Sequence, residues 1–271
     1  MFKIGIIGIG NMGEAILKGI LSNTNISSDE IIVSDKNKER IDYIVNKYSV
    51  AGTDSNERLA KLSEIVFLVV KPKDLQKVLP PIGNLLDNKI LISVLAGTKI
   101  QRIKEFAKNA KIIRIMPNTP ALVGESATGV TFDKNIKDEE KENILNLLNS
   151  FGKSIVVEEE LMDAITGLSG SGPAYVLSFI EGLILGGIKQ GLSYNQALDL
   201  ATQTVLGTVK MLIETKEHPA VLRDKVSSPA GTTIYGLHEL EKGKFKDTII
   251  SAIEAATKRS KELSKWLIAN W

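Results

Sequence analysis

A glycine-rich turn near the start of the chain constrains the fold most strongly. Residues 2–7 are mostly apolar and β-branched, which is typical of a buried parallel strand. Gly8, Gly10 and Gly13 follow in G-x-G-x-x-G spacing, and the apolar residues of 14–21 recur at helical spacing. A strand, a glycine turn and a helix in this order predict a dinucleotide-binding site. The alternative is a glycine-rich turn that binds no ligand.

The three glycines have separate roles in such a site. Gly8 permits the tight turn, Gly10 lets the backbone approach a pyrophosphate, and Gly13 lets the helix pack closely on the strand. The free N–H groups at the start of the helix then face the phosphates.

An acidic residue, Asp35, ends the next predicted strand (31–35), about 20 residues after the glycines. An acid at this distance usually accepts the ribose hydroxyls of NAD(H) and would repel a 2′-phosphate. The neighbouring Lys36, Lys38 and Arg40 leave two interpretations open. They form either a basic cluster that holds the phosphate or a solvated helix face.

Strands and helices alternate through the first half of the chain. Further strands are predicted at 65–70, 89–94, 111–116, 129–132 and 154–157, and helices at 38–47, 56–62, 74–86, 100–107 and 138–151. This alternation predicts an α/β fold, a Rossmann-like, doubly wound, mostly parallel sheet, over residues 1–158.

Residues 159–271 show no clear strand and predict a second, all-α domain, whose first helix is expected over 162–168. Small residues, including Gly182, Gly186 and Gly187, recur in its most apolar helix (174–188). Glycine inside a helix costs about 1 kcal/mol against alanine, so this row indicates that a helix packs very closely there, either a second helix of the same chain or one from a partner subunit. We therefore expect a dimerisation domain. The last long helix is predicted over 245–263, and its basic residues are expected on a solvated face: Lys258, Arg259, Lys261 and Lys265. The tail Trp266–Trp271 suggests no role.

Composition excludes several classes of function. The formal net charge of +2 gives no electrostatic case for binding nucleic acid or a membrane surface. The absence of cysteine excludes disulfides and thiolate catalysis, and two histidines outside any H-E-x-x-H motif argue against a metal site. No signal peptide is apparent, and we expect no bilayer-spanning stretch because Glu181 interrupts 174–188. These features predict a cytoplasmic protein.

A second candidate site lies at residues 226–234, where hydroxyl residues and a glycine precede a predicted helix that runs to about residue 240. Such a helix start offers backbone N–H groups, a partial positive charge and side-chain donors to one small anion. The alternative is ordinary N-capping by Ser or Thr. Together with the nucleotide site, this segment predicts hydride transfer between a redox cofactor and a small anionic substrate.

Five segments of the chain together resemble the Δ1-pyrroline-5-carboxylate reductase family. They are residues 5–13, 70–72, 114–120, 166–175 and 228–233, in the family's order across essentially the whole chain. The last three are specific to the family, whereas many dehydrogenases share the first. The resemblance implies that NADPH or NADH reduces the C=N bond of pyrroline-5-carboxylate to give L-proline. It also implies a homodimer that can assemble further, often to a decamer.

The motif match assigns residues to two sites. Thr233 would be the catalytic residue and would hydrogen-bond the ring nitrogen, and Glu159 is a weaker candidate for contact with the substrate. The substrate carboxylate would be held by Ser228, Gly231, Thr232 and Thr233. Beside Gly13 and Asp35, the cofactor site would be lined by Gly8, Gly10, Asn11, Met12, Asn56, Val70, Lys71, Pro72, Ala96 and Gly97.

The chain departs from the family pattern at two positions. Ala230 replaces the first glycine of the usual Ser-Pro-Gly-Gly, and an alanine is strained there if φ is positive. Relatives that prefer NADPH tend to carry Ser or Asn at the position of Asp35. By charge repulsion we expect this chain to use NADH at least as well as NADPH.

Two other functions remain open at this point. One is a different NAD(P)-dependent reductase, acting on another imine or on a β-hydroxyacid. Such enzymes usually place a lysine in a central helix of the second domain, whereas Lys189 and Lys210 lie far along their helices from the expected site. The other is a non-catalytic dinucleotide sensor, which would have no reason to keep residues 228–233 intact.

Overall fold

The structure is a computed structural model that describes the backbone of residues 1–269 and the side chains of residues 1–263. The tail residue Trp271 lies outside the described part. The chain forms two compact units: Met1–Ser171 together with the chain from Glu254 on, and Gly172–Ile253. The domain boundary that we place after residue 158 is a division by sequence and stays a prediction.

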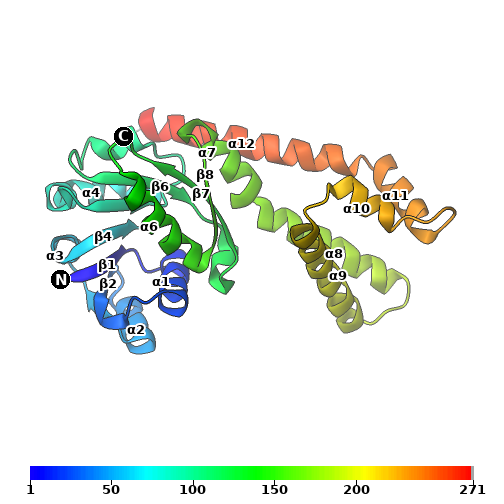
Figure 1. Ribbon diagram of the computed structural model, residues 1–271, viewed down its shortest axis with the longest axis horizontal. Helices are drawn as coiled ribbons and strands as arrows, with labels where there is room; N and C mark the ends of the chain where they lie inside the picture. Colours follow the sequence, from blue (N-terminus) through cyan, green and yellow to red (C-terminus); the bar gives the residue numbers. More distant parts are fainter. Residues whose placement is uncertain (270–271) are drawn as a thin grey trace. The chain divides into compact units, whose positions relative to one another are not determined.

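The first unit is built on one eight-stranded sheet in the order β3-β2-β1-β4-β5-β6-β7-β8 (Figure 1). All neighbouring strands are parallel except β6 and β7, which are antiparallel. The strands are β1 (Phe2–Ile7), β2 (Ile31–Ser34), β3 (Ala51–Thr53), β4 (Ser63–Leu68), β5 (Ile90–Ser93), β6 (Lys111–Met116), β7 (Ser126–Phe132) and β8 (Gly152–Val156). The predicted doubly wound, mostly parallel sheet is confirmed.

Helices cover both faces of this sheet. One apolar core lies between the sheet and α1, α2 and α6, and includes Ile16, Ile44 and Leu148. The other lies between the sheet and α3, α4 and α5, and includes Leu59, Leu79 and Ile103. The helices of this unit are α1 (Asn11–Asn23), α2 (Lys38–Tyr48), α3 (Asn56–Leu62), α4 (Leu75–Ile82), α5 (Ile100–Lys104), α6 (Asp138–Leu148) and α7 (Met162–Ile165).

The winding direction reverses between β1 and β4, and this reversal positions the nucleotide site. β1 pairs with β2 on one side and β4 on the other, with Ile7 opposite both Ser34 and Leu68. The three strands therefore end level with one another, and the residues that follow them meet at one edge of the sheet. In open α/β sheets ligands bind in the crevice at this kind of switch point.

The second unit is helical and has a very small apolar core of its own. Ile184, Ala197 and Ala201 form its buried cluster, where α8 packs on α9. The remaining helices of the chain are α8 (Gly172–Lys189), α9 (Tyr194–Thr215), α10 (Pro219–Lys225), α11 (Thr232–Lys242) and α12 (Phe245–Ala269). The prediction of an all-α second region is confirmed.

One expectation about the apolar helix is wrong. The helical stretch Glu159–Lys189 is long and apolar enough to cross a membrane by length and composition, and 6% of its apolar window is buried. Glu181 alone does not interrupt it, because one charged residue leaves the rest of the window apolar. A single such helix is weak evidence for a membrane span, since a helix face that another subunit covers has the same composition.

Three further details differ from the sequence-based prediction. The short edge strand β3 was not predicted, because Ala51–Thr53 is too short to show an alternating pattern. The single helix expected over 74–86 is α4 flanked by two short 3₁₀ turns, with Pro80 and Pro81 inside α4. The helix expected over 162–168 is α7 followed by a π-helical segment, Thr166–Gly170.

Candidate active site

The glycine turn between β1 and α1 has the geometry that a nucleotide site needs. Gly8 has a φ of 91°, and a Cβ atom there would lie 2.2 Å from the carbonyl oxygen of Val69. A Cβ at Gly13 would lie 2.2 Å from the carbonyl oxygen of Gly8. Neither position can therefore hold a side chain without moving the backbone. Gly8 thus permits the tight turn, and Gly13 the close packing, that the spacing predicts.

Gly10 is different, because a Cβ atom there would meet no described atom within 4 Å. The space above Gly10 is open, and α1 begins directly after it with no side chain capping its first N–H groups. Such an uncapped helix start, next to an open approach to the backbone, fits a pyrophosphate. The local geometry therefore fits a bound dinucleotide.

A cavity of about 420 Å³ lies at the switch point of the sheet. Half of the predicted cofactor residues line it, and they follow four neighbouring strands, β3, β2, β1 and β4. These residues are Gly8, Gly10, Asp35, Asn56, Val70 and Lys71. The orientation of the Asn56 carboxamide is fixed, because its Oδ1 accepts a hydrogen bond of 2.8 Å from the Ser34 hydroxyl.

A second cavity of about 560 Å³ begins at Lys71 and contains the other predicted loop residues, Pro72, Ala96 and Gly97. Sequence reasoning missed part of its lining. It also includes Thr166, Ser171, Arg259 and Ser260. Thr166 and Ser171 lie in a segment that carries the family resemblance, and that resemblance is the signal that could have found them.

Arg259, one of the basic residues expected on a solvated face of the last helix, lines this second cavity. The helix is held there because the neighbouring Ser260 hydroxyl donates a hydrogen bond of 2.6 Å to Asp163. No local signal in the sequence predicts this contact. The side chain of Lys265, expected on the same face, lies outside the described residues. Of the remaining predicted cofactor residues, Asn11 is exposed at the start of α1, and Met12 packs against the core.

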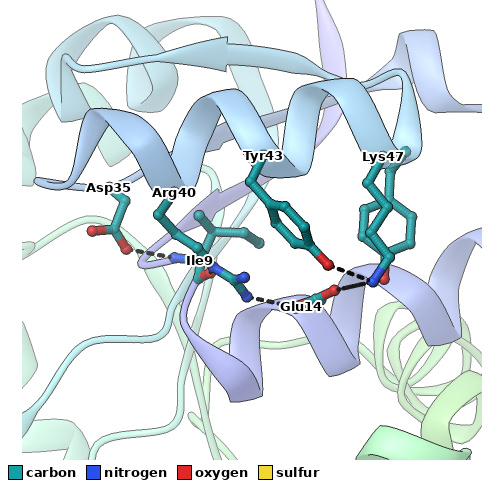
Figure 2. Close-up of polar contacts among 7 residues, drawn as sticks. Ile9, Glu14, Asp35, Arg40, Tyr43 and Lys47 are labelled. Atoms are coloured by element: carbon teal, nitrogen blue, oxygen red, sulfur yellow. Dashed lines mark hydrogen bonds and ion pairs between the residues drawn. The ribbon is translucent and has the colours of Figure 1, made fainter.

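Asp35 follows β2 and lines the first cavity, as its position in the sequence predicts. Its Oδ2 accepts the N–H of Ile9 at 2.9 Å, and its Oδ1 accepts the N–H of Asn37 at 3.0 Å. Figure 2 shows Asp35 reaching from the start of α2 to the glycine turn. The carboxylate is thereby fixed at the edge of the cavity, with lone pairs remaining for a ligand.

Arg40 does not lie on a solvated face, which corrects one of the two interpretations of the basic cluster. Its Nε donates a hydrogen bond of 2.7 Å to the carbonyl oxygen of Ile9, and its Nη2 forms an ion pair with Glu14. Its guanidinium also lies 5.1 Å from the ring centroid of Tyr43. Lys38 is exposed as that interpretation predicts, whereas Lys36 is exposed and also lines the first cavity, so the phosphate-binding interpretation stays open for Lys36. The ion pair is invisible in the sequence because Arg40 and Glu14 belong to different helices.

The Glu14 carboxylate accepts hydrogen bonds from three side chains. Besides Arg40, its Oε1 accepts from the Lys47 ammonium at 2.9 Å and from the Tyr48 hydroxyl at 2.8 Å. Burial alone would raise the pKa of Glu14, but the donors Lys47, Arg40 and Tyr48 outweigh it and lower the pKa to about 2. Glu14 is therefore ionised at neutral pH, and its negative charge is paired with the positive charge of Arg40.

Glu159 is held within the first unit by two partners. Its Oε1 accepts the N–H of Ile100 at 2.8 Å and lies 3.3 Å from the Arg114 guanidinium. The Arg114 side chain is only 5% exposed, so its charge depends on this carboxylate. Glu159 thus fixes the chain that follows the Ala96–Gly97 turn. Its role as a substrate contact stays a prediction.

The predicted substrate segment lies in the second unit, at the start of α11. Ser228 and Thr232 are exposed and Thr233 is half-buried. A turn joins the N–H of Gly231 to the carbonyl oxygen of Ser228 at 3.0 Å, and a Cβ at Gly231 would lie 2.1 Å from the Ser228 hydroxyl. A side chain at Gly231 would therefore displace the Ser228 hydroxyl from its present position.

The start of α11 carries no side-chain cap: the N-cap residue is Gly231, and no side chain accepts from the first N–H groups. The ordinary capping interpretation of this segment is therefore wrong, and the N–H groups remain available to an anion. Ala230 has a φ of 56°, in the left-handed region. The alanine at this position is thus strained, because the conformation favours glycine.

Comparisons with known proteins agree with this architecture. Residues 159–263 match the family model for pyrroline-5-carboxylate reductase dimerisation, and residues 3–97 match a family of coenzyme F420-dependent NADP oxidoreductases. A pyrroline-5-carboxylate reductase from Synechocystis is 43% identical over 97% of this chain and 98% of its own length. One from Arabidopsis thaliana is 42% identical over 97% and 96% of the two chains.

The chain belongs to the pyrroline-5-carboxylate reductase family. It is therefore an oxidoreductase. Among solved structures, the pyrroline carboxylate reductase of Plasmodium falciparum with NADP bound is similar, with a TM-score of 0.88 and 36% identity over 97% of this chain and 98% of that one.

The donors around Glu14 give a prediction for acid unfolding. Since the pKa of Glu14 in the folded state is about 2, against an ordinary value of 4.5, its stabilising contribution is present above the ordinary value and is lost as the pH falls toward 2. Glu14→Gln should therefore unfold at lower urea than the wild type near neutral pH, and the gap should narrow as the pH falls. Glu39→Gln, on the exposed face of α2, is the control. A gap that stays constant down to about pH 3 would contradict this account.

Proposed function

We propose that this chain reduces the C=N bond of 1-pyrroline-5-carboxylate to give L-proline, the last step of proline biosynthesis. The observation that carries the proposal is the pairing of two sites in one chain of this family. One is an open glycine turn at a cavity that fits a dinucleotide, and the other is an uncapped helix start bearing hydroxyl groups. A nicotinamide cofactor and a small carboxylate substrate need these two sites.

We assign separate residues to binding the substrate carboxylate and to orienting the C=N bond. We assign the substrate carboxylate to the N–H groups at the start of α11, with the hydroxyls of Ser228 and Thr232, because a helix start stabilises an anion. We assign the Thr233 hydroxyl to the ring nitrogen, as its donor or acceptor. A reduced nicotinamide supplies the hydride, which forms the new C–H bond at the imine carbon while the nitrogen takes a proton. Positioning of the two reactants then provides most of the acceleration.

We propose that NADH serves at least as well as NADPH. Asp35 is fixed by the N–H groups of Ile9 and Asn37 at the edge of the cavity, where a ribose hydroxyl can donate to it. A 2′-phosphate at the same place would meet a negative charge and be repelled.

Asp35→Ser tests this cofactor preference. Removing the charge should raise the ratio of kcat/KM with NADPH to kcat/KM with NADH by about tenfold, because one repulsive charge is removed close to the phosphate. The measurement is the initial rate of nicotinamide oxidation with each cofactor at saturating pyrroline-5-carboxylate. Asp42→Ser, on α2, is the matched control. An unchanged ratio would contradict the role of Asp35.

The second unit supports a homodimer. Large apolar side chains on its helices are mostly exposed, among them Leu177 at 66%, Leu185 at 60% and Ile213 at 67%. A Cβ atom at Gly182 or Gly186 would meet no described atom within 4 Å. The small residues of α8 therefore need a partner that packs closely, and we propose a second copy of this chain. Assembly to a decamer, a cytoplasmic location and the absence of nucleic-acid or membrane partners remain part of this proposal.

Gly182→Leu tests the dimer. A leucine in the middle of the close helix contact should raise the dimer dissociation constant by at least about tenfold, because overpacking separates the helices. Sedimentation equilibrium measures the dissociation constant, and circular dichroism verifies that the helices are retained. Lys61→Leu, on α3, introduces the same side chain outside the proposed interface. Equal dissociation constants for both variants and the wild type would contradict the placement of the interface.

Thr233→Ala separates a reductase from a dinucleotide sensor. Loss of a hydrogen bond to the reacting nitrogen should lower kcat/KM for pyrroline-5-carboxylate by about a hundredfold, while the dissociation constant for NADH stays within about twofold. Thr248→Ala removes an exposed hydroxyl elsewhere in the second unit and should leave both quantities unchanged. A near-normal rate for Thr233→Ala would contradict the proposed substrate site.

A further inference from the structure

Ile9, in the glycine turn, forms hydrogen bonds through both its backbone N–H and its carbonyl oxygen to side chains of the segment that follows β2. Asp35 accepts the Ile9 N–H at 2.9 Å, and Arg40 donates to the Ile9 carbonyl at 2.7 Å (Figure 2). The guanidinium of Arg40 and the carboxylate of Asp35 therefore lie on either side of one residue in the glycine turn. Asp35 and Lys36 line the nucleotide cavity. Arg40 lies outside that lining, but its hydrogen bond to Ile9 holds a second cation of this segment against the glycine turn, close to the ribose end that Asp35 marks.

In this position Arg40 would normally favour a phosphate. Guanidinium groups bind phosphate oxygens with two parallel hydrogen bonds, and an arginine close to the ribose accommodates the extra phosphate of NADP. Here, however, its Nη2 is already paired with Glu14 on α1. The side chains of Arg40 and Glu14 are only 25% and 16% exposed, so water screens this pair little.

Glu14 is itself held in place, so it cannot easily release Arg40. Lys47 and Tyr48 both donate to the carboxylate oxygen Oε1, and Lys47 also donates to the Tyr43 hydroxyl at 2.9 Å. These contacts tie α1 to α2 and keep Glu14 turned toward Arg40, as Figure 2 shows. The bound carboxylate and the guanidinium form a neutral pair beside the cavity.

We propose that Glu14 is a specificity-determining residue for the cofactor: its carboxylate engages Arg40 and cancels its charge, and thereby disfavours the 2′-phosphate of NADPH. The inference rests on the proposed function, because it needs a nicotinamide dinucleotide in the cavity lined by Asp35. It goes beyond the direct repulsion by Asp35, since neither Glu14 nor Arg40 lines that cavity and Glu14 acts by cancelling the charge of Arg40 beside the glycine turn. A purely structural strut between α1 and α2 would affect both cofactors alike.

Glu14→Gln is the decisive variant. The amide retains the size and a hydrogen-bond acceptor but leaves the positive charge of Arg40 uncompensated. We expect the dissociation constant for NADPH to fall by about five- to tenfold, because one unit of negative charge near a phosphate is removed at a partly solvated site. The dissociation constant for NADH should change by less than about twofold, and the gain for NADPH should shrink as salt is raised. Binding is measured by titrating nucleotide fluorescence on the whole protein without substrate.

Two further variants identify the source of the gain. Lys47→Met removes another partner of the same Glu14 carboxylate but leaves Arg40 paired, so it should not improve NADPH binding. Arg40→Met combined with Glu14→Gln should abolish the gain, because the freed cation is gone. Urea unfolding of each variant verifies that the first unit is folded.

The outcomes are distinct. If Glu14→Gln leaves the ratio of the NADPH and NADH dissociation constants unchanged, or weakens both cofactors alike, the inference is overturned and Glu14 is a strut. If the gain persists without Arg40, the route through Arg40 is overturned. If the wild type binds neither nucleotide, the proposed function fails as well. Normal binding of both with an unchanged ratio overturns this inference alone.

Discussion

The close approach of backbone to backbone at the glycine turn is the constraint on which the nucleotide-binding half of the molecule depends. Gly8 leaves space for the carbonyl of Val69, and Gly13 leaves space for the carbonyl of Gly8. A side chain at either position would push β1, β4 and α1 apart. The same tight turn leaves the start of α1 uncapped and Gly10 open, so the packing that closes the sheet also creates the place for a pyrophosphate.

Charges around this turn are arranged to hold it in place. Asp35 and Arg40 bind opposite sides of Ile9, and Glu14 connects Arg40 to α1. Each of these contacts joins groups that are far apart in the chain, and together they fix the turn against β2 and α2. Fixed polar groups of this kind discriminate between ligands because they do not need to reorganise when one binds.

The second unit is stabilised in a different way from the first. Its helices bury few apolar residues of their own, and Gly182 and Gly186 on α8 face open space in the described chain, whereas Gly187 packs against Ala197 of α9. A helical unit with this little core gains its stability from apolar surface covered by another subunit. Its hydropathy also produces one stretch that resembles a membrane helix, which shows that composition alone does not separate a bilayer from a protein interface.

Much of this could be predicted from the sequence, because the decisive signals are local. The glycine spacing, the apolar runs and the change to helices after residue 158 are all read from neighbouring residues. The pairing of Arg40 with Glu14, and the position of Arg259 at a cavity, could not be predicted, since these contacts join separate elements. Helical periodicity marks a charged residue as surface, and it carries no information about which partner lies opposite.

The most direct test of the central claim is the loss of nicotinamide absorbance when the purified protein is mixed with pyrroline-5-carboxylate, in parallel with NADH and NADPH. The account predicts fast oxidation that depends on the imine and yields proline, with NADH at least as effective as NADPH. If both cofactors bind and neither is oxidised, the fold and the nucleotide site stand, and the assignment of pyrroline-5-carboxylate as the substrate is contradicted.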